Sequence, residues 1–417
     1  MQSRNASSAR TNPLELTILL TSFIAATYAF GIYLFSTLLP DMRVALSLSY
    51  TEIGWITGIA QIGFLAGAIV SAQLVRIMGA ARLILSSVLA CCTCLSLMPL
   101  VTNAFQIAVL LVMTGCAAAT VWVPMVSVVQ SGIPLRHQGK VLGLISSGTA
   151  YGLFLSGLSI PRLLPLGGWK SIWIFSAALT FILWVWGLLR LRISKEMLIV
   201  DDSNRDRASS VLGWVAVIRD PLAITVIMLM FLNGIACMPT MNYLVAFLRE
   251  EIGYSVESAG WVWSTIGFVG MFGGFAMGAL ADRITVAWSL SLAYVLLGVS
   301  TLLFLHHASI GEVLIGAAFF GLAFNSIFGL IPAFVSQSFD SHNATAVFAL
   351  SNFMLGLGSM LGNLLGGLVR DQEHSFFPVY VGSFVINLLL VFLCSYLQHA
   401  HRNRDSRVIT EESVVGV

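Results

Sequence analysis

The sequence predicts an all-helical polytopic membrane protein, with twelve transmembrane helices arranged as two pseudo-symmetric six-helix bundles. Three observations support this fold class: an apolar composition, twelve long apolar segments, and an internal repeat. Of the 417 residues, 58% are hydrophobic and 10% are charged, whereas soluble domains carry about 25% charged residues. The mean hydropathy is +0.91. Such a chain cannot cover itself with polar surface, so we expect it to lie in a lipid bilayer.

Each apolar segment is long enough to cross a bilayer as a helix, which takes about 20 residues. The segments are continuous rather than alternating, which favours helices over barrel strands. The first segment exceeds the apolar core of a cleavable signal peptide. The expected spans are 14–40, 52–75, 82–101, 104–131, 139–162, 169–190, 221–248, 257–281, 286–306, 311–338, 343–369 and 376–398.

Positive charge is distributed unevenly over the predicted loops. An even number of spans places both termini on one side, and 16 of the 21 Lys and Arg residues fall on that side. The other five are Arg43, Arg162, Lys170, Arg249 and Arg370. The positive-inside rule therefore predicts cytoplasmic termini. The compact loops favour a bacterial inner membrane.

This topology predicts the outcome of reporter fusions. A reporter joined after Asn103 or Glu250 is expected to report from outside the cell, and one after Lys195 from the cytoplasm, because loops alternate between the two sides. Paired alkaline phosphatase and fluorescent-protein fusions measure this. A cytoplasmic signal at Asn103 or Glu250 would contradict the twelve-span topology.

The two halves of the chain repeat with an offset of 206 residues. The offset aligns Gly54 with Gly260, Trp55 with Trp261, and Gly115 with Gly321. It also places AQLVRIM, at 72–78, over GALADRI, at 278–284. Six spans per half predict parallel repeats about an axis along the membrane normal. We expect a first bundle at 1–190, a charged cytoplasmic linker at 191–220, and a second bundle with a tail at 221–417.

Two motifs resemble the major facilitator superfamily. GALADRI is similar to the family's loop motif between helices 8 and 9, and GGWKSIWIF, at 167–175, to its turn between helices 5 and 6. Leu111 stands where the family's helix-4 motif has arginine, and GTAYGLFLSG, at 148–157, lacks the proline of the antiporter motif. The resemblance implies a transporter with two helical halves, while these departures argue against simple proton-antiport drug efflux.

The resemblance also implies that helices 1, 4, 7 and 10 line a central substrate cavity. Asparagines in these spans must face protein or water, because an unpaired amide in lipid costs several kcal/mol. Packing against neighbouring helices is the alternative role for them. The candidate cavity residues are Tyr28, Tyr33, Trp122, Asn233, Asn242, Tyr243 and Asn325.

Charged residues are missing from the middle of every predicted span. Such a cavity suits a neutral or amphipathic organic solute better than a small, multiply charged anion. Asp41, at the end of the first span, is a candidate proton carrier, with an ordinary interfacial carboxylate as the alternative.

The opposite ends of the spans contain a candidate cytoplasmic gate. Asp282, followed by Arg283, ends span 8 near the start of span 5, which carries Arg136 and Lys140. In the first half Arg76 occupies the position equivalent to Asp282, and it would face Asp340 at the start of span 11. We expect both sets to hold the gate shut. Alternatively, Arg76 is one more charge that faces lipid headgroups.

Glycines four residues apart let helix backbones approach closely. We expect these ladders where the two halves meet: Gly54/Gly58, Gly63/Gly67, Gly148/Gly152, Gly270/Gly274/Gly278 and Gly358/Gly362/Gly366.

These features together predict a secondary transporter that moves a small organic solute by alternating access, and not an enzyme. The expected partners are the solute, a proton or another coupling ion, and lipid; no cofactor, metal or nucleic acid is expected, and the chain is expected to be a monomer. A siderophore or drug exporter and a facilitated-diffusion uniporter remain alternatives within the fold. A membrane enzyme is disfavoured because the histidines lie at loops or span ends, and a transporter-like sensor because no signalling domain is evident.

Overall fold

A computed structural model describes residues 13–133, 135–191 and 219–415. The linker predicted at 191–220 therefore lies almost wholly outside the described residues. The helices, in chain order, are α1 (Pro13–Ile24), η1 (Ala25–Tyr33), α2 (Leu34–Leu46), α3 (Tyr50–Met78), α4 (Ala80–Leu97), η2 (Met98–Leu100), α5 (Ala104–Gly132), α6 (Leu135–Ser146), α7 (Gly148–Arg190), α9 (Pro221–Ala246), η5 (Phe247–Glu251), α10 (Val256–Ala281), α11 (Val286–His306), α12 (Ile310–Ser338), α13 (Ser341–Glu373) and α14 (Phe377–Val415).

The described chain crosses the bundle twelve times, as the sequence predicts. Eleven helical segments are long and apolar enough to span a membrane, and one of them, Lys140–Arg190, is 51 residues long. That segment turns at Gly167 and Gly168, whose backbone angles are not helical. Gly168 has φ +65°, a conformation that glycine adopts without strain. The turn predicted from GGWKSIWIF is thus present, and it divides this segment into two spans.

The internal repeat is visible in matching helix contacts. A methyl group on Gly115 would lie 2.7 Å from the carbonyl oxygen of Ala60, and one on Gly321 would lie 2.3 Å from that of Ile266. Both residues of the second pair are 206 positions beyond those of the first. Equivalent helices therefore pack backbone to backbone at equivalent points, which confirms the two pseudo-symmetric bundles.

The first span is longer than predicted. It continues through η1 and α2 to Leu46 instead of ending near residue 40. Pro40 lies inside α2 without ending it. The central segment, η1, is a nine-residue π-helix, a wider coil that is uncommon and often found at functional sites.

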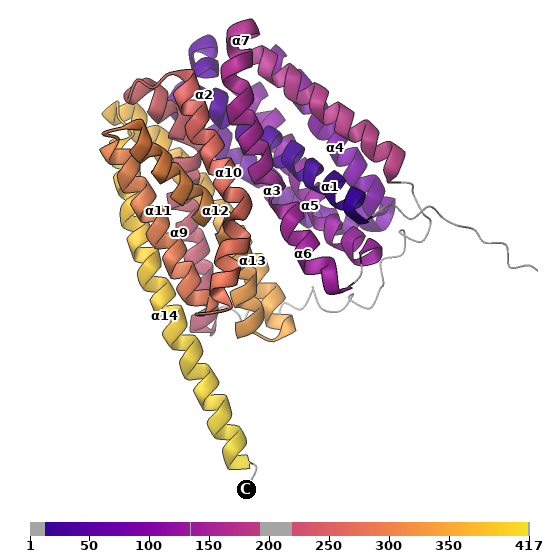
Figure 1. The fold of residues 1–417 in the computed structure, drawn as a ribbon, viewed down its shortest axis with the longest axis vertical. Coiled ribbons are helices and arrows are strands. Elements are labelled where there is room, and N and C mark those ends of the chain that lie inside the picture. The colour runs from indigo at the N-terminus through magenta and orange to yellow at the C-terminus, as the bar shows by residue number, and fades with distance from the viewer. Residues whose placement is uncertain (1–12, 134, 192–218, 416–417) are drawn as a thin grey trace, which may run out of the picture.

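The two bundles meet at one end of the molecule. They approach each other near the upper ends of α2 and α7 and diverge toward α6 and α13 (Figure 1). Contacts between the halves join α3 to α13, α7 to α10, and α2 to α9. We call the end where α2 and η5 finish the latch end. The opposite end, from which α14 projects, is the terminal end.

Most of the glycine ladders lie inside a bundle, contrary to the prediction. Gly63 packs on α5, Gly148 on α1, and Gly358 on α9. The Gly54/Gly58 ladder does lie between the halves, against α13, as predicted, and Gly260, outside the predicted ladders, packs against α7. A four-residue spacing identifies a smooth helix face, but it does not identify the helix that covers that face.

Candidate functional site

Two ion pairs connect the bundles at the latch end. The Arg43 guanidinium in α2 donates from Nε and Nη2 to the Glu250 carboxylate in η5, at 3.2 and 3.0 Å. Arg249 donates to both oxygens of Asp41, with Nη2 3.1 Å from Oδ1. The four side chains are only 17–31% exposed. We call these two bidentate pairs the latch; such pairs are the more specific and stronger kind of charge-assisted hydrogen bond.

The latch follows the pseudo-symmetry of the fold. Arg43 and Arg249 are 206 residues apart, so each arginine occupies the same position in its own half. Each reaches across to a carboxylate of the other half. About two helical turns deeper, the Ser36 hydroxyl donates to Asn242 Oδ1 at 2.7 Å, again between positions 206 apart. The pseudo-symmetry axis therefore passes between α2 and α9.

Asp371 of the second half binds the start of a helix of the first. Its carboxylate accepts hydrogen bonds from the backbone N–H of Tyr50 at 3.0 Å and of Thr51 at 2.7 Å. The Thr51 hydroxyl also donates to it at 2.7 Å. These N–H groups open α3, where no partner exists within the helix and the dipole favours an anion. The Tyr50 hydroxyl donates to Glu250 at 2.6 Å, which connects this contact to the latch.

A buried amide network lies beneath the latch. Asn242 accepts from Ser36 and donates through Nδ2 to Asn363 Oδ1 at 3.0 Å. The Tyr243 hydroxyl donates to the Asn363 carbonyl oxygen at 2.7 Å. Asn242 is 5% exposed and Tyr243 is fully buried. Asn242 therefore connects the halves through Ser36, whereas the hydrogen bond of Tyr243 joins α9 to α13 within the second half.

Replacing Asn242 with alanine is expected to weaken the closed latch end. The change leaves buried partners in α2 and α13 unpaired, at about 1–3 kcal/mol. We expect a lower Tm and greater labelling of a cysteine placed at Thr37, whereas a pure substrate contact would raise KM and leave labelling unchanged. Asn352→Ala is the control, because Asn352 is only partly buried and its side-chain amide donates to the Phe348 carbonyl oxygen within its own helix. Equal Tm values for both variants would contradict the network.

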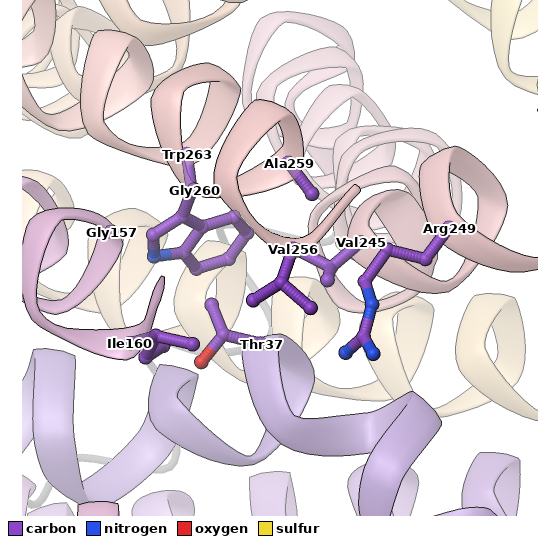
Figure 2. A pocket seen from close by; sticks show the side chains of 9 residues that line it. All are labelled: Thr37, Gly157, Ile160, Val245, Arg249, Val256, Ala259, Gly260 and Trp263. Carbon is purple, nitrogen blue, oxygen red and sulfur yellow. The ribbon is translucent and has the colours of Figure 1, made fainter. Parts of the chain in front are cut away.

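A pocket and a smaller void lie on either side of Arg249. The latch pocket, of about 910 Å³, is lined by Pro40, Asp41, Arg43, Val44, Ala45, Leu164, Gly168, Trp169, Arg249, Glu250, Tyr254, Ser255, Val256 and Arg370. A void of about 10 Å³, room for about one water molecule, lies one turn deeper among Thr37, Val245 and Trp263 (Figure 2). Arg249 lines both, so the Asp41–Arg249 pair separates the latch pocket from the space between the bundles.

The remaining predicted cavity residues of the first half are partly exposed. Tyr28 in η1 lies edge-on to Phe64, with ring centroids 5.9 Å apart. Tyr33 and Trp122 pack at the margins of the two hydrophobic clusters. This partial exposure is compatible with the predicted role in a cavity.

The asparagines of the second half are packed differently. Asn233 is 1% exposed and accepts a hydrogen bond from the Cys237 thiol. The Asn325 amide donates to the Gly321 carbonyl oxygen at 3.0 Å, and it lies against Gly270 of α10. In this conformation both side chains bind within their own bundle, as the packing alternative described.

The predicted gate at the terminal end is not assembled in this conformation. Arg76, Lys140, Asp282 and Arg283 are exposed and form no ion pair among the described residues. Asp340 caps α13 by accepting from the Asn343 backbone N–H and side-chain amide. The side chain of Arg136 lies outside the described part of the chain. The halves are apart at this end, so the expected pairings stay a prediction for another conformation.

Sequence reasoning found Asp41 but missed its partner. The sequence did contain a signal. Arg43 and Arg249 are equivalent at the 206-residue offset, and each has an acidic residue within two positions, Asp41 and Glu250 respectively. The predicted spans, however, ended at residues 40 and 248, which placed Arg43, Arg249 and Glu250 in loops. Asp371 carried no signal, because its partner is the backbone of another helix.

Comparison with known proteins agrees with this architecture. The sequence model of the Major Facilitator Superfamily matches residues 21–363 and 226–412. A protein of Haemophilus influenzae named for metabolite transport is 25% identical over 267 residues, covering 61% of this chain and 60% of its own length. The 4-hydroxybenzoate transporter PcaK of Pseudomonas aeruginosa is 22% identical over 300 residues, covering 64% of this chain and 65% of its own length. The chain thus spans less than two thirds of either relative.

Solved structures show the same fold. A variant of the nucleoside transporter NupG superposes with a TM-score of 0.75 at 15% identity, covering 92% of this chain and 99% of that one. An inward-facing, unoccupied bacterial homologue of the human lysosomal transporter Spinster superposes with a TM-score of 0.70 at 16% identity, covering 95% and 98%. With twelve crossings, two matching halves and a family match over most of its length, this chain belongs to the Major Facilitator Superfamily of membrane transporters.

Proposed function

We propose that the protein is a secondary transporter that carries a small organic solute by alternating access, and that this conformation faces inward. The observation that supports this most is the reciprocal latch, which closes one end of the interface between the halves. At the other end, glycines on helices of both halves, Gly143 and Gly278, have no neighbouring atoms within 4 Å of an added methyl group. If the positive-inside rule holds, the open end faces the cytoplasm.

The substrate class follows from the charges of the helices. In the described chain, the ionised groups between the halves gather at the latch end, and the buried polar side chains deeper in the bundles are hydroxyls and amides. This favours a neutral or amphipathic solute, and we propose that Tyr28, Tyr33 and Trp122 contribute to its cavity. Similar proteins are named for the transport of 4-hydroxybenzoate and of nucleosides, solutes that both contain an aromatic ring with polar groups, which suits such a lining.

The energy source is proposed to be an ion gradient. The sequence has no phosphate-binding loop of the Gly-x4-Gly-Lys-Ser/Thr type. Asp41 remains the candidate proton carrier, now with a specific consequence. Protonation would remove the charge that holds Arg249 and would loosen the latch. Coupling of this kind needs a difference in proton affinity between the two conformations.

The function is tested by comparing metabolites in deletion and overexpression cells, followed by counterflow in proteoliposomes with each solute that changes. We expect at least one amphipathic organic solute to exchange across the vesicle membrane, and an imposed pH gradient to drive its accumulation. Exchange of the solute without its accumulation would favour a uniporter. Accumulation of the solute in the outward direction would favour an exporter. If no solute exchanges although the protein is folded and correctly inserted, the transport proposal fails.

A further inference from the structure

The latch pocket contains a guanidinium that the latch does not use. Its lining includes three arginines and two carboxylates, and four of these five groups are occupied in the two ion pairs. The fifth, Arg370 near the end of α13, makes no ion pair or hydrogen bond with the described residues, and its Nε is buried without a partner. The pocket lining therefore contains one guanidinium that no carboxylate of the lining pairs with, although the adjacent Asp371, outside the lining, interacts with it electrostatically.

Aromatic rings hold the Arg370 side chain in place. The centre of its guanidinium lies 5.3 Å from the Tyr50 ring centroid and 5.0 Å from that of Phe376. Cation–π contacts of this kind stabilise the guanidinium without using its N–H donors. A positioned guanidinium with free donors matches a carboxylate, which it binds with two parallel hydrogen bonds.

The rest of the lining suits a small organic body. Trp169, Leu164, Val44 and Val256 supply aromatic and aliphatic surface. The volume of about 910 Å³ falls within the range of small-molecule sites. A single guanidinium without an ion-pair partner, beside this aromatic and aliphatic surface, favours a singly charged amphipathic anion over a multiply charged one.

The lining comes from both halves, which links occupancy to conformation. Pro40, Asp41, Arg43, Val44, Ala45, Leu164, Gly168 and Trp169 belong to the first half, whereas Arg249, Glu250, Tyr254, Ser255, Val256 and Arg370 belong to the second. Opening the latch end separates these surfaces and dismantles the pocket. A ligand that binds one conformation better shifts the population toward it.

We propose that the latch pocket is a regulatory site for an organic monocarboxylate, which binds Arg370 from the latch side and holds the latch closed. Such a ligand inhibits transport without being carried. The inhibition rests on the proposed transport function, but the binding and the closure do not.

Binding is tested with the purified full-length protein in nanodiscs of phosphatidylcholine, which lack anionic headgroups. Calorimetry compares benzoate with benzamide, a neutral molecule of the same shape. We expect benzoate to bind and benzamide to bind about tenfold more weakly or worse, the ratio set by the loss of a charge-assisted pair. Equal binding of both probes would overturn the site, and this comparison needs no variant.

Arg370→Gln is expected to weaken benzoate binding about tenfold, because it removes the charge and the paired donors. Lys170→Gln is the matched control. Lys170 is exposed at the same end and lies over the Trp169 ring, but it is not part of the pocket lining. A loss of benzoate binding as large in Lys170→Gln as in Arg370→Gln would show a diffuse charge effect and reject the site.

Closure is tested by labelling. In a background without native cysteines, Thr37→Cys places a thiol in the void beneath the latch, which a reagent on the latch side reaches only when that end opens. Benzoate should slow this labelling severalfold in the parent and not in Arg370→Gln. Faster labelling, or slowing that persists in Arg370→Gln, would overturn the proposal. Slowed labelling in a protein that carries no solute would keep the site and reject the transport function.

Discussion

Replacing Asp41 with asparagine is expected to release the latch and lower the transport rate at least about tenfold. The change leaves Arg249 without its carboxylate at a position where both side chains are four-fifths buried. Breaking a fully buried pair costs about 3–5 kcal/mol, and we expect about 1–3 kcal/mol for this partly exposed one. That shifts the balance between the two conformations by about 5- to 150-fold. Labelling of Thr37→Cys from the latch side should rise accordingly.

The control and the rescue make this prediction specific. Glu312→Gln removes a carboxylate at the same end, where Glu312 pairs with the largely exposed His306 within one half. It should change neither labelling nor transport. The exchange of Asp41→Arg with Arg249→Asp should recover part of the loss, because the pair is restored in reverse. If the exchange is no better than Asp41→Asn, the two side chains do not act as a pair.

Gly54→Ala and Gly260→Ala should have the next largest effect, and both should favour the conformation with the latch end open. A methyl group on Gly54 would lie 2.7 Å from the Asn363 carbonyl oxygen, and one on Gly260 would lie 2.6 Å from that of Gly157. These backbone atoms belong to the opposite half and cannot rotate away. Such overpacking costs about 1–3 kcal/mol. The cost destabilises only the conformation in which the latch end is closed.

Two further glycines separate conformational from structural effects. Gly115→Ala creates a similar clash with Ala60, but inside one bundle. It should lower Tm while leaving the labelling of Thr37→Cys unchanged. Gly274→Ala meets no atom within 4 Å here and should affect neither measurement in this conformation. Increased labelling in Gly115→Ala, or none in Gly54→Ala, would show that the contacts between the halves do not set the balance.

The sequence was sufficient for the spans and the repeat, because both depend on local apolarity and on identities at a fixed offset. It was insufficient for the first span, where Asp41 and Arg43 lower the local hydropathy although the helix continues through them. Their helical position depends on partners about 207 residues away, which no local pattern contains. Pairing across the halves therefore extends the helix beyond its apolar segment.

The candidate site, too, could be predicted from the sequence only in part. Asn233, Asn242 and Asn325 were selected correctly as polar groups that must face protein or water. Which neighbour each one meets depends on helix rotation, and the structure gives three different answers: a thiol in the same helix, a hydroxyl across the interface, and a carbonyl oxygen one turn earlier. The residue type thus predicts that each amide forms hydrogen bonds, whereas the packing of the helices determines which group it bonds to.

The π-helix η1 determines how the first span responds to the loss of a residue. Each residue of an α-helix turns the chain by about 100°, and a π-helical segment accommodates residues that a regular α-helix of the same length would not. Deleting one residue from Ala25–Tyr33 would let this segment tighten into an α-helix, which would leave Ser36 facing Asn242 and Asp41 facing Arg249. Deleting one residue of α2 between Ser36 and Asp41 would instead rotate Asp41 away from Arg249 by about 100°. The widened coil thus acts as a phase reserve, so a deletion in η1 should be far less harmful than the same deletion in α2.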